Sequence, residues 1–132
     1  MPTSFLKWNL LITDIGFILY WTIAALNILP AAWMYKDFQN PILFAWNWSF
    51  APLDVVASGL GIFSLWLARK GSSNWNLLAF VSICMTFCAG LMAISFWVIR
   101  QDFELLWWLP NLYLIFWPVI YVISITRKSK SA

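Results

Sequence analysis

The sequence predicts an all-α integral membrane protein, an antiparallel bundle of four transmembrane helices with its N- and C-termini in the cytoplasm. First, 63% of the 132 residues are hydrophobic and 10% are charged, whereas a typical soluble domain is about 25% charged. Second, a soluble domain of this size leaves roughly 30% of its unfolded surface in water, which eight basic and five acidic side chains cannot cover. Third, the chain contains four apolar runs of about the 20 residues that cross a bilayer.

The four runs form one predicted domain over residues 1–132, and each ends at a residue that stops or anchors a membrane helix. The first run stops at Pro30, the second at the basic pair that begins with Arg69, the third before Arg100, and the fourth at the basic tail that begins with Arg127. The connections are short, so neighbouring helices are expected to pack antiparallel. The predicted spans are 5–29, 42–68, 75–99 and 107–126.

The orientation follows from the distribution of Lys and Arg, because basic residues are enriched in cytoplasmic segments. Two basic residues lie in the first and third loops, Lys36 and Arg100. Six lie in the N-terminal segment, the second loop and the C-terminal tail, namely Lys7, Arg69, Lys70, Arg127, Lys128 and Lys130. Both termini are therefore predicted to be cytoplasmic in a bacterial plasma membrane, and the basic excess indicates topology rather than nucleic-acid binding.

Most of the aromatic residues near the loops fit belts at the two membrane interfaces. The inner belt comprises Trp8, Trp66 and Trp75. The outer belt is heavier and comprises Trp33, Tyr35, Trp46, Trp48, Trp97, Trp107 and Trp108. Trp21 and Trp117 lie nearer the middle of the membrane, where they would either pack in the bundle or line a cavity.

Common catalytic and metal-binding groups are scarce in this sequence. The chain has no His, which removes the commonest general base and metal ligand. Cys84 and Cys88, at i and i+4 of one predicted helix, do not have the geometry of a disulfide and are interpreted as small packing residues. No cofactor, metal site or catalytic set is predicted, and an enzyme is the weakest of the functional interpretations.

Two acidic residues lie inside the apolar runs. A charged side chain at the centre of a membrane helix costs about 2.5–3.5 kcal/mol on insertion scales. Asp54 is predicted near the middle of the bilayer and Asp14 in its cytoplasmic half. Structural alternatives are an ion pair of Asp14 with Lys7 and a helix–helix hydrogen bond of Asp54, but a functional role for at least one of them is favoured.

Small and polar residues recur at helical spacing around these acids. One face of the second span carries Asn47, Ala51, Asp54, Ser58 and Gly61. The third span carries Ser82, Thr86 and Gly90, a spacing typical of close helix packing. The fourth carries Asn111, Leu114, Pro118 and Tyr121, with Pro110 and Pro118 as expected kinks. The residues predicted to bind a ligand are Asp14, Asp54, Asn47, Ser58, Asn111, Trp117 and Tyr121.

Four acidic and basic loop residues besides Arg100 are expected to be solvated. Asp102 and Glu104 follow Arg100 in the third loop, and Lys36 precedes Asp37 in the first. We interpret each group as a local surface cluster.

Three segments together resemble the YvaD-like family of uncharacterised membrane proteins from Bacillus and its relatives. They are TDIGFILYW from Thr13, KDFQNPILFAWNWSFAPLD from Lys36 and FWVIRQDFELLWWLPNL from Phe96. The resemblance covers nearly the whole chain. It implies four spans in a bacterial plasma membrane and brings no assigned activity.

A more distant resemblance is to the four-helix membrane proteins of the sterol-isomerase and sigma-2-receptor group. The Asn40–Pro41 step and Asp54 occupy places comparable with an Asp-Pro or Asn-Pro step and a mid-helix acid in that group. Asp14 lies near the start of its helix, where the group has its acid towards the far end, and the catalytic His of the isomerases has no counterpart. The resemblance implies a lipophilic pocket that contains a carboxylate.

Three functions remain open at this point. The favoured one is a protein that binds a lipophilic or cationic small molecule, or a lipid, in a pocket around Asp54 and Asp14. A second is a proton-coupled transporter that resembles the small multidrug-resistance family, acting as a homodimer in which Asp14 alternates between a proton and a cationic drug. A third is an accessory or immunity protein that contacts a larger membrane partner.

Overall fold

The computed structural model describes residues 1–130, with side chains described up to Arg127, so the side chains of Lys128 and Lys130 in the predicted basic tail lie outside the described residues. All regular secondary structure in this part of the chain is helical. The elements are α1 (Ser4–Ala25), α2 (Ala31–Met34), α3 (Pro41–Trp48), α4 (Phe50–Arg69), α5 (Trp75–Ile99) and α6 (Leu105–Lys130).

Within the described residues, four helical stretches are long and apolar enough to cross a membrane. They are α1, the consecutive helices α3 and α4, α5, and α6 up to Arg127. This confirms the all-helical class and the four apolar runs predicted from the sequence. The larger differences from the predicted spans, in the first and the second, have local reasons.

The first helix ends at Ala25, earlier than the predicted Leu29. The amide of Leu26 still bonds to the carbonyl of Thr22 at 3.0 Å, but Asn27 has a φ of 50°. That left-handed conformation, which Asn tolerates better than most residues, turns the chain out of the helix. At its start α1 is capped by Thr3, whose Oγ1 accepts from the Leu6 amide at 3.2 Å.

The second predicted span is divided at Ser49 into α3 and α4. Pro52 has no N–H to donate to the carbonyl four residues earlier, that of Trp48, so the helical ladder cannot pass through this point unbroken. The Ser49 hydroxyl instead donates to the Trp46 carbonyl at 2.6 Å. The fourth helix differs less, since it begins at Leu105 rather than Trp107 and continues through Pro110 and Pro118.

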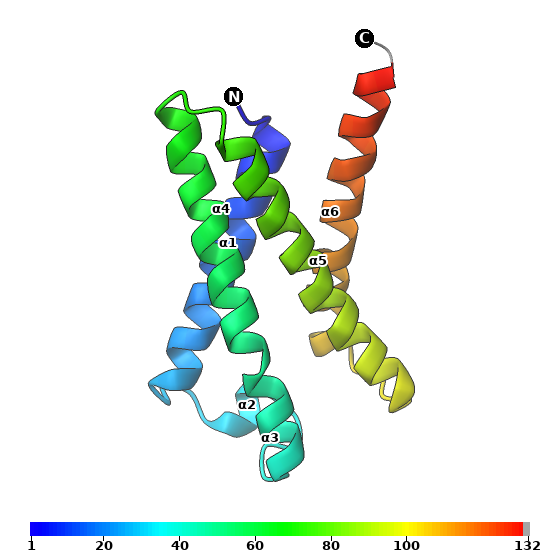
Figure 1. Cartoon of the computed structure of the whole chain (residues 1–132). Coiled ribbons are helices and arrows are strands. Elements are labelled where there is room, and N and C mark those ends of the chain that lie inside the picture. The colour runs from blue at the N-terminus through cyan, green and yellow to red at the C-terminus, as the bar shows by residue number, and fades with distance from the viewer. Residues whose placement is uncertain (131–132) are drawn as a thin grey trace.

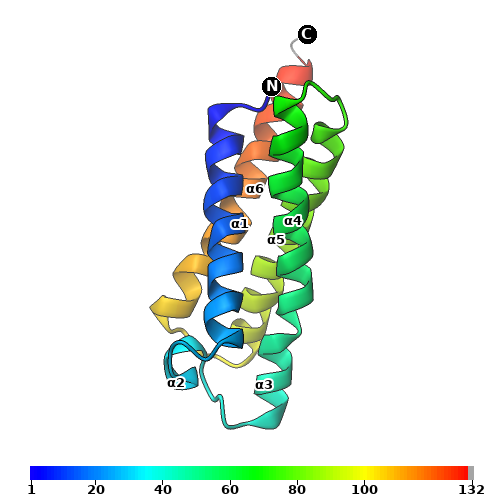
Figure 2. The ribbon, with the colours of Figure 1, turned by 90° about the vertical axis from the view of Figure 1, so that its left-hand side faces the viewer.

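The described helices form an elongated molecule in which the chain passes repeatedly between two ends. Figures 1 and 2 show the N-terminus, the α4–α5 turn and the C-terminal part of α6 at one end, and α2, α3 and the α5–α6 loop at the other. Helix α4 packs against both α1 and α5, and α6 packs mainly against α5. The first loop, with Lys36 and Asp37, and the α5–α6 loop, with Arg100, Asp102 and Glu104, are therefore brought to the end that carries α2.

The stripe of Ser82, Thr86 and Gly90 is buried against neighbouring helices, as its spacing predicted. At Gly90 a Cβ would lie 2.7 Å from the Asn111 carbonyl oxygen and 2.8 Å from the Leu114 Cβ. Because only glycine leaves this space free, α5 and α6 approach closely at this point.

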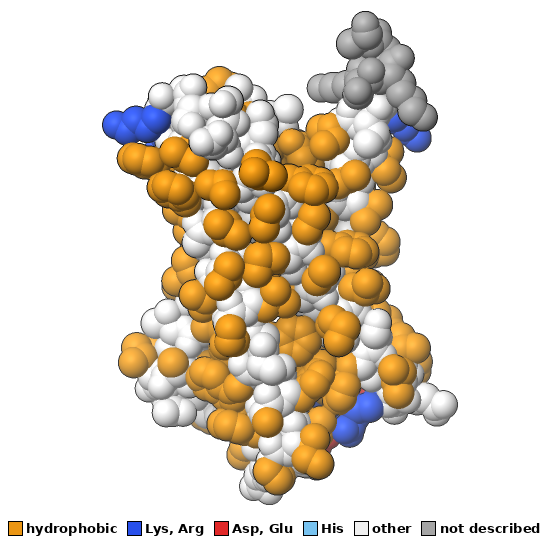
Figure 3. All heavy atoms as spheres, in the orientation of Figure 1, with side chains coloured by type: hydrophobic (Ala, Val, Ile, Leu, Met, Phe, Trp, Pro, Cys, Tyr) orange, Lys and Arg blue, Asp and Glu red, His pale blue; other side chains and the backbone are white. Residues whose placement is uncertain are grey.

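The apolar core lies toward the end with the termini. It consists of Leu6, Leu10, Leu65, Ala79, Ile83 and Trp117, and the half-buried Tyr121 packs against it. Outside the core, many large hydrophobic side chains are exposed on the described surface. Figure 3 shows them covering the middle of one face, with Lys and Arg side chains at its two ends. Cys84 and Cys88 are free thiols, and both are exposed rather than buried as packing residues.

Candidate functional site

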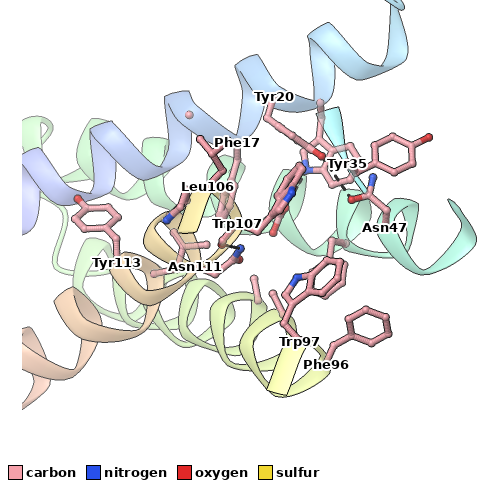
Figure 4. Close-up of a pocket in the computed structure, with 18 of the residues that line it drawn as sticks. Phe17, Tyr20, Tyr35, Asn47, Phe96, Trp97, Leu106, Trp107, Asn111 and Tyr113 are labelled. Carbon is pink, nitrogen blue, oxygen red and sulfur yellow. Dashed lines mark hydrogen bonds between the residues drawn. The ribbon is translucent and has the colours of Figure 1, made fainter. Parts of the chain in front are cut away.

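A cavity of about 410 Å³ lies among α1, α3, α4, α5 and α6, at the end of the molecule away from the core. Its wall is mostly apolar, and aromatic residues form the largest group in it. Figure 4 shows side chains from α1, α3, α5 and α6 around it. The aromatic lining includes Phe17, Tyr20, Trp21, Trp46, Phe96, Trp97 and Trp107.

Asp54 supplies the carboxylate of this cavity. Helix α4 turns it inward, so only 5% of the residue is exposed. Its Oδ2 accepts a hydrogen bond from the indole Nε1 of Trp21 at 2.8 Å. Its Oδ1 is buried and has no hydrogen-bond partner among the described residues. The cavity wall therefore holds one acceptor that is satisfied by the protein and one that is not.

Asn47 lies on α3 beyond the break at Ser49 and still lines the same cavity as Asp54. The Tyr20 hydroxyl is 3.5 Å from Asn47 Oδ1 and donates to the Met34 carbonyl at 3.1 Å. Asn47 Nδ2 is buried without a partner in the described structure. Two residues of the cavity wall thus each carry one buried polar atom without a partner, a donor on Asn47 and an acceptor on Asp54.

Asn111 lines the cavity from α6, and its side-chain amide donates a hydrogen bond within its own helix. Its Nδ2 donates to the Trp107 carbonyl at 2.7 Å (Figure 4). Tyr113, which also lines the cavity from α6, donates from its hydroxyl to Asn9 Oδ1 at 2.6 Å. This second bond joins the α6 part of the wall to α1, whereas the Asn111 bond lies within α6.

The structure separates the seven residues predicted to bind a ligand. Asp54, Asn47 and Asn111 line the cavity, whereas the other four do not. Trp117 and Tyr121 belong to the apolar core and its edge. Asp14 and Ser58 are completely buried where the helices pack together.

Asp14 lies opposite Gly61, since a Cβ added at Gly61 would overlap its Oδ2. Gly61 follows Asp54 by seven residues on α4, so the two acids are separated by about 10 Å along the bundle at 1.5 Å per residue. The ion pair with Lys7, which was the structural alternative for Asp14, is absent from the described residues. Lys7 Nζ instead lies 5.5 Å from the centroid of the Trp8 ring.

The charged loop residues pair across the two loops rather than forming separate surface clusters. Lys36 Nζ lies 2.6 Å from Asp102 Oδ2 and 3.6 Å from Glu104 Oε2. Arg100 Nη2 lies 3.0 Å from Asp37 Oδ2. The hydrogen bond to Asp102 raises the pKa of Lys36. Lys36 also lines the cavity, so these ion pairs tie together two loops at its edge.

Sequence reasoning missed most of the aromatic wall, because four of its residues were assigned to the outer interface belt and the Phe residues were given no role. Tyr35 and Trp97 are buried, and Trp46 stacks on Phe96 with 3.8 Å between ring centroids. The one available signal was the position of Trp21 nearer the middle of the membrane. From that position we expected Trp21 either to pack in the bundle or to line a cavity. Trp21 does both. It lines the cavity, where its indole N–H donates to Asp54, and its ring packs on Tyr20 with 4.9 Å between the ring centroids.

These features define a helical protein whose described residues include four stretches apolar enough to cross a membrane, with a largely apolar cavity that is rich in aromatic residues and contains one carboxylate. The chain belongs to a family of unknown function (DUF5360), whose model matches residues 6–132. It is 42% identical over 126 residues to the uncharacterized protein YvaD of Bacillus subtilis (strain 168), a match that covers 96% of this chain and 95% of that protein.

These comparisons confirm the resemblance to the YvaD-like family. No solved structure matches the chain. The more distant resemblance to the sterol-isomerase and sigma-2-receptor group receives no support from them.

Proposed function

We propose that this protein is a multi-pass protein of a bacterial plasma membrane that binds a lipophilic small molecule in the cavity between its helices. In the proposed arrangement four antiparallel spans cross the bilayer and both termini are cytoplasmic. The charge distribution supports this orientation. Arg69, Lys70 and Arg127 lie at the end with the termini, and Lys36 and Arg100 lie at the opposite end.

The observation that carries the proposal is the unpartnered Oδ1 of Asp54 in a largely apolar wall that is rich in aromatic residues. A buried polar group without a partner is costly, and a ligand that donates a hydrogen bond to Oδ1 would remove that cost. The volume of about 410 Å³ falls in the range of small-molecule pockets, roughly 300–1,000 Å³. The aromatic rings would supply the contact area.

The two unused groups also define the polar part of the ligand. Asp54 Oδ1 accepts a hydrogen bond, and Asn47 Nδ2 donates one. A hydroxyl group can satisfy both, whereas a protonated amine satisfies Asp54 and adds an ion pair. The proposed ligand is therefore an apolar molecule that carries a hydroxyl or amine group.

The positions of the two acids favour ligand binding at Asp54 over transport through Asp14. In the transporter interpretation Asp14 must be accessible to both a drug and the proton. Asp14 is 0% exposed and does not line the cavity. The carboxylate with access to a ligand-sized space is that of Asp54.

Native mass spectrometry of the gently extracted protein tests this function. The wild type is expected to carry a small molecule that is lost in Asp54→Asn, and the released mass would identify it. Asp14→Asn is the matched control, since it makes the same chemical change away from the cavity, and it is expected to retain the molecule. Retention by Asp54→Asn, or a ligand-free dimer of the wild type, would contradict the proposal.

A further inference from the structure

Asp14 is a second buried acid whose surroundings differ from those of Asp54. It is fully buried between α1 and α4, and neither carboxyl oxygen has a hydrogen-bond partner among the described residues. Each ion pair in the described chain involves loop residues at the end that carries α2. A buried carboxyl group of this kind is either protonated or, when it is charged, paired or bound to a metal ion.

One hydroxyl, that of Ser82, lies close to Asp14, and two more lie on the same buried faces of α4 and α5. At Gly61, the position of a Cβ would overlap Asp14 Oδ2 and lie 2.9 Å from Ser82 Oγ, which brings the carboxylate and this hydroxyl to the same small space. Ser58 lies one turn before Gly61 on the buried face of α4, and Thr86 lies one turn after Ser82 on the buried face of α5.

The hydroxyls of Ser58 and Thr86 are unusual because they bond to no described atom although both residues are fully buried. Ser and Thr in helices commonly bond back to their own backbone. Ser64, also fully buried on α4, does so and donates to the Gly61 carbonyl at 2.6 Å. The hydroxyl of Ser82 crosses to the Ala57 carbonyl at 2.8 Å. Ser58 and Thr86 therefore keep free oxygen lone pairs on the buried faces of α4 and α5 that also carry Gly61 and Ser82.

We propose that Asp14 and the hydroxyls of Ser58, Ser82 and Thr86 bind a monovalent cation, Na⁺, between α1, α4 and α5. All of these groups are oxygen ligands, which hard cations prefer. One carboxylate neutralises one unit of positive charge, so a monovalent ion leaves the interior neutral and a divalent ion does not. Helices α1 and α4 pack so closely here that a Cβ at Gly61 would overlap Asp14 Oδ2, and such close packing favours a small ion over K⁺. This site uses none of the cavity residues and goes beyond the proposed ligand binding.

Equilibrium binding of radioactive sodium to the purified full chain in detergent tests the site. The wild type is expected to bind one Na⁺ per chain saturably, with KCl a weak competitor. Asp14→Asn is expected to abolish binding. Thr86→Val is expected to weaken it about tenfold, because one contact worth roughly 1.4 kcal/mol is lost.

Two matched variants separate this site from general effects on the fold and from the cavity. Ser64→Ala removes an equally buried hydroxyl that is already bonded to its own helix, and it is expected to bind Na⁺ as the wild type does. Asp54→Asn is expected to lose the cavity ligand but to keep Na⁺. If Asp14→Asn does not fold, the comparison of Thr86→Val with Ser64→Ala decides, and equal affinities would overturn the proposal.

Two further results would overturn it. One is the absence of saturable sodium binding by the wild type. The other is an infrared carbonyl band of a protonated carboxylic acid that disappears in Asp14→Asn and does not respond to NaCl. That band would mean that a proton, not a metal ion, neutralises Asp14.

Discussion

Trp21 shows at the scale of a single residue how a carboxylate is accommodated in an apolar interior. Its indole N–H donates to Asp54 Oδ2 at 2.8 Å, and its ring packs on Tyr20 and Trp48. One side chain thus supplies both the polar partner and part of the hydrophobic wall.

Removal of that donor is expected to destabilise the protein. Trp21→Phe keeps an aromatic ring but leaves Asp54 Oδ2 without its partner, at a cost of about 1–3 kcal/mol for an unsatisfied buried group. Trp33→Phe is the control, because Trp33 is 74% exposed and should change stability little. Reversible unfolding of the two variants in mixed detergent measures the difference, and equal effects would contradict the role of Trp21.

Gly61 gives a second prediction for a single residue. Gly61→Ala places a methyl group where Asp14 Oδ2 lies, and overpacking of this kind typically costs about 1–3 kcal/mol. Gly59→Ala, on the same helix with nothing within 4 Å of its Cβ position, should be neutral or stabilising. Melting temperatures compare the two. Shortening the acid in the double variant Gly61→Ala/Asp14→Ala should restore part of the loss, and its failure to do so would argue against this contact.

At the scale of elements, two loops far apart in the sequence are joined by ion pairs. Lys36 reaches Asp102, and Arg100 reaches Asp37. From the sequence alone, each charged residue was grouped with its neighbours in the chain. The observed partners depend on the fold, which brings the α2–α3 loop and the α5–α6 loop to the same end of the molecule. The pairing therefore depends on tertiary structure that no local pattern records.

Charge exchange tests this connection. Lys36→Asp is expected to lower the melting temperature modestly at low salt, and the exchange Lys36→Asp/Asp102→Lys should restore much of the loss. The exchange Arg100→Asp/Asp102→Arg should restore none of the stability that Arg100→Asp loses alone, since these residues are neighbours in sequence but not partners. The differences in melting temperature between the variants should become smaller in high salt, because screening weakens exposed ion pairs. Equal recovery by both exchanges would contradict the observed pairing.

The pH dependence of this connection has a definite sign. The hydrogen bond to Asp102 raises the pKa of Lys36 in the folded protein. The contribution of Lys36 to folding stability is therefore fully present when the pH is below the pKa of Lys36 in the unfolded chain. It is lost as the pH rises through the higher folded-state pKa. Melting temperatures of the wild type and Lys36→Met should therefore converge at strongly alkaline pH and differ at neutral pH. A difference that persists at high pH would show that contacts other than the charge are responsible.

For the whole molecule, the sequence was sufficient to predict the helical class and the four apolar runs, because each rests on composition and length alone. The faces of the second and third spans followed from helical spacing, and Asp54, Ser58, Gly61, Ser82 and Thr86 are all buried. The division at Ser49 was missed although Pro52 was a visible signal. The separation of Asp14 from Asp54 depends on how α1 is rotated and raised against α4, which one sequence does not record.

The proposed orientation is tested on intact cells. In a background with Cys84→Ala and Cys88→Ala, single cysteines are introduced as Gln39→Cys in the α2–α3 loop and Ser73→Cys in the α4–α5 turn. A membrane-impermeant maleimide should label the former on intact cells and the latter only after permeabilisation. The reverse pattern would place both termini outside the cytoplasm.

The contact between Gly61 and Asp14 also constrains how the family can diverge. The two positions share one small volume, so a substitution at either changes what the other can accommodate. Relatives that carry a side chain at the position of Gly61 should therefore have a residue shorter than Asp at the position of Asp14, and relatives that keep the acid should keep the glycine. An alignment of the family would show the two positions changing together, while the position of Gly59 varies independently of Asp14.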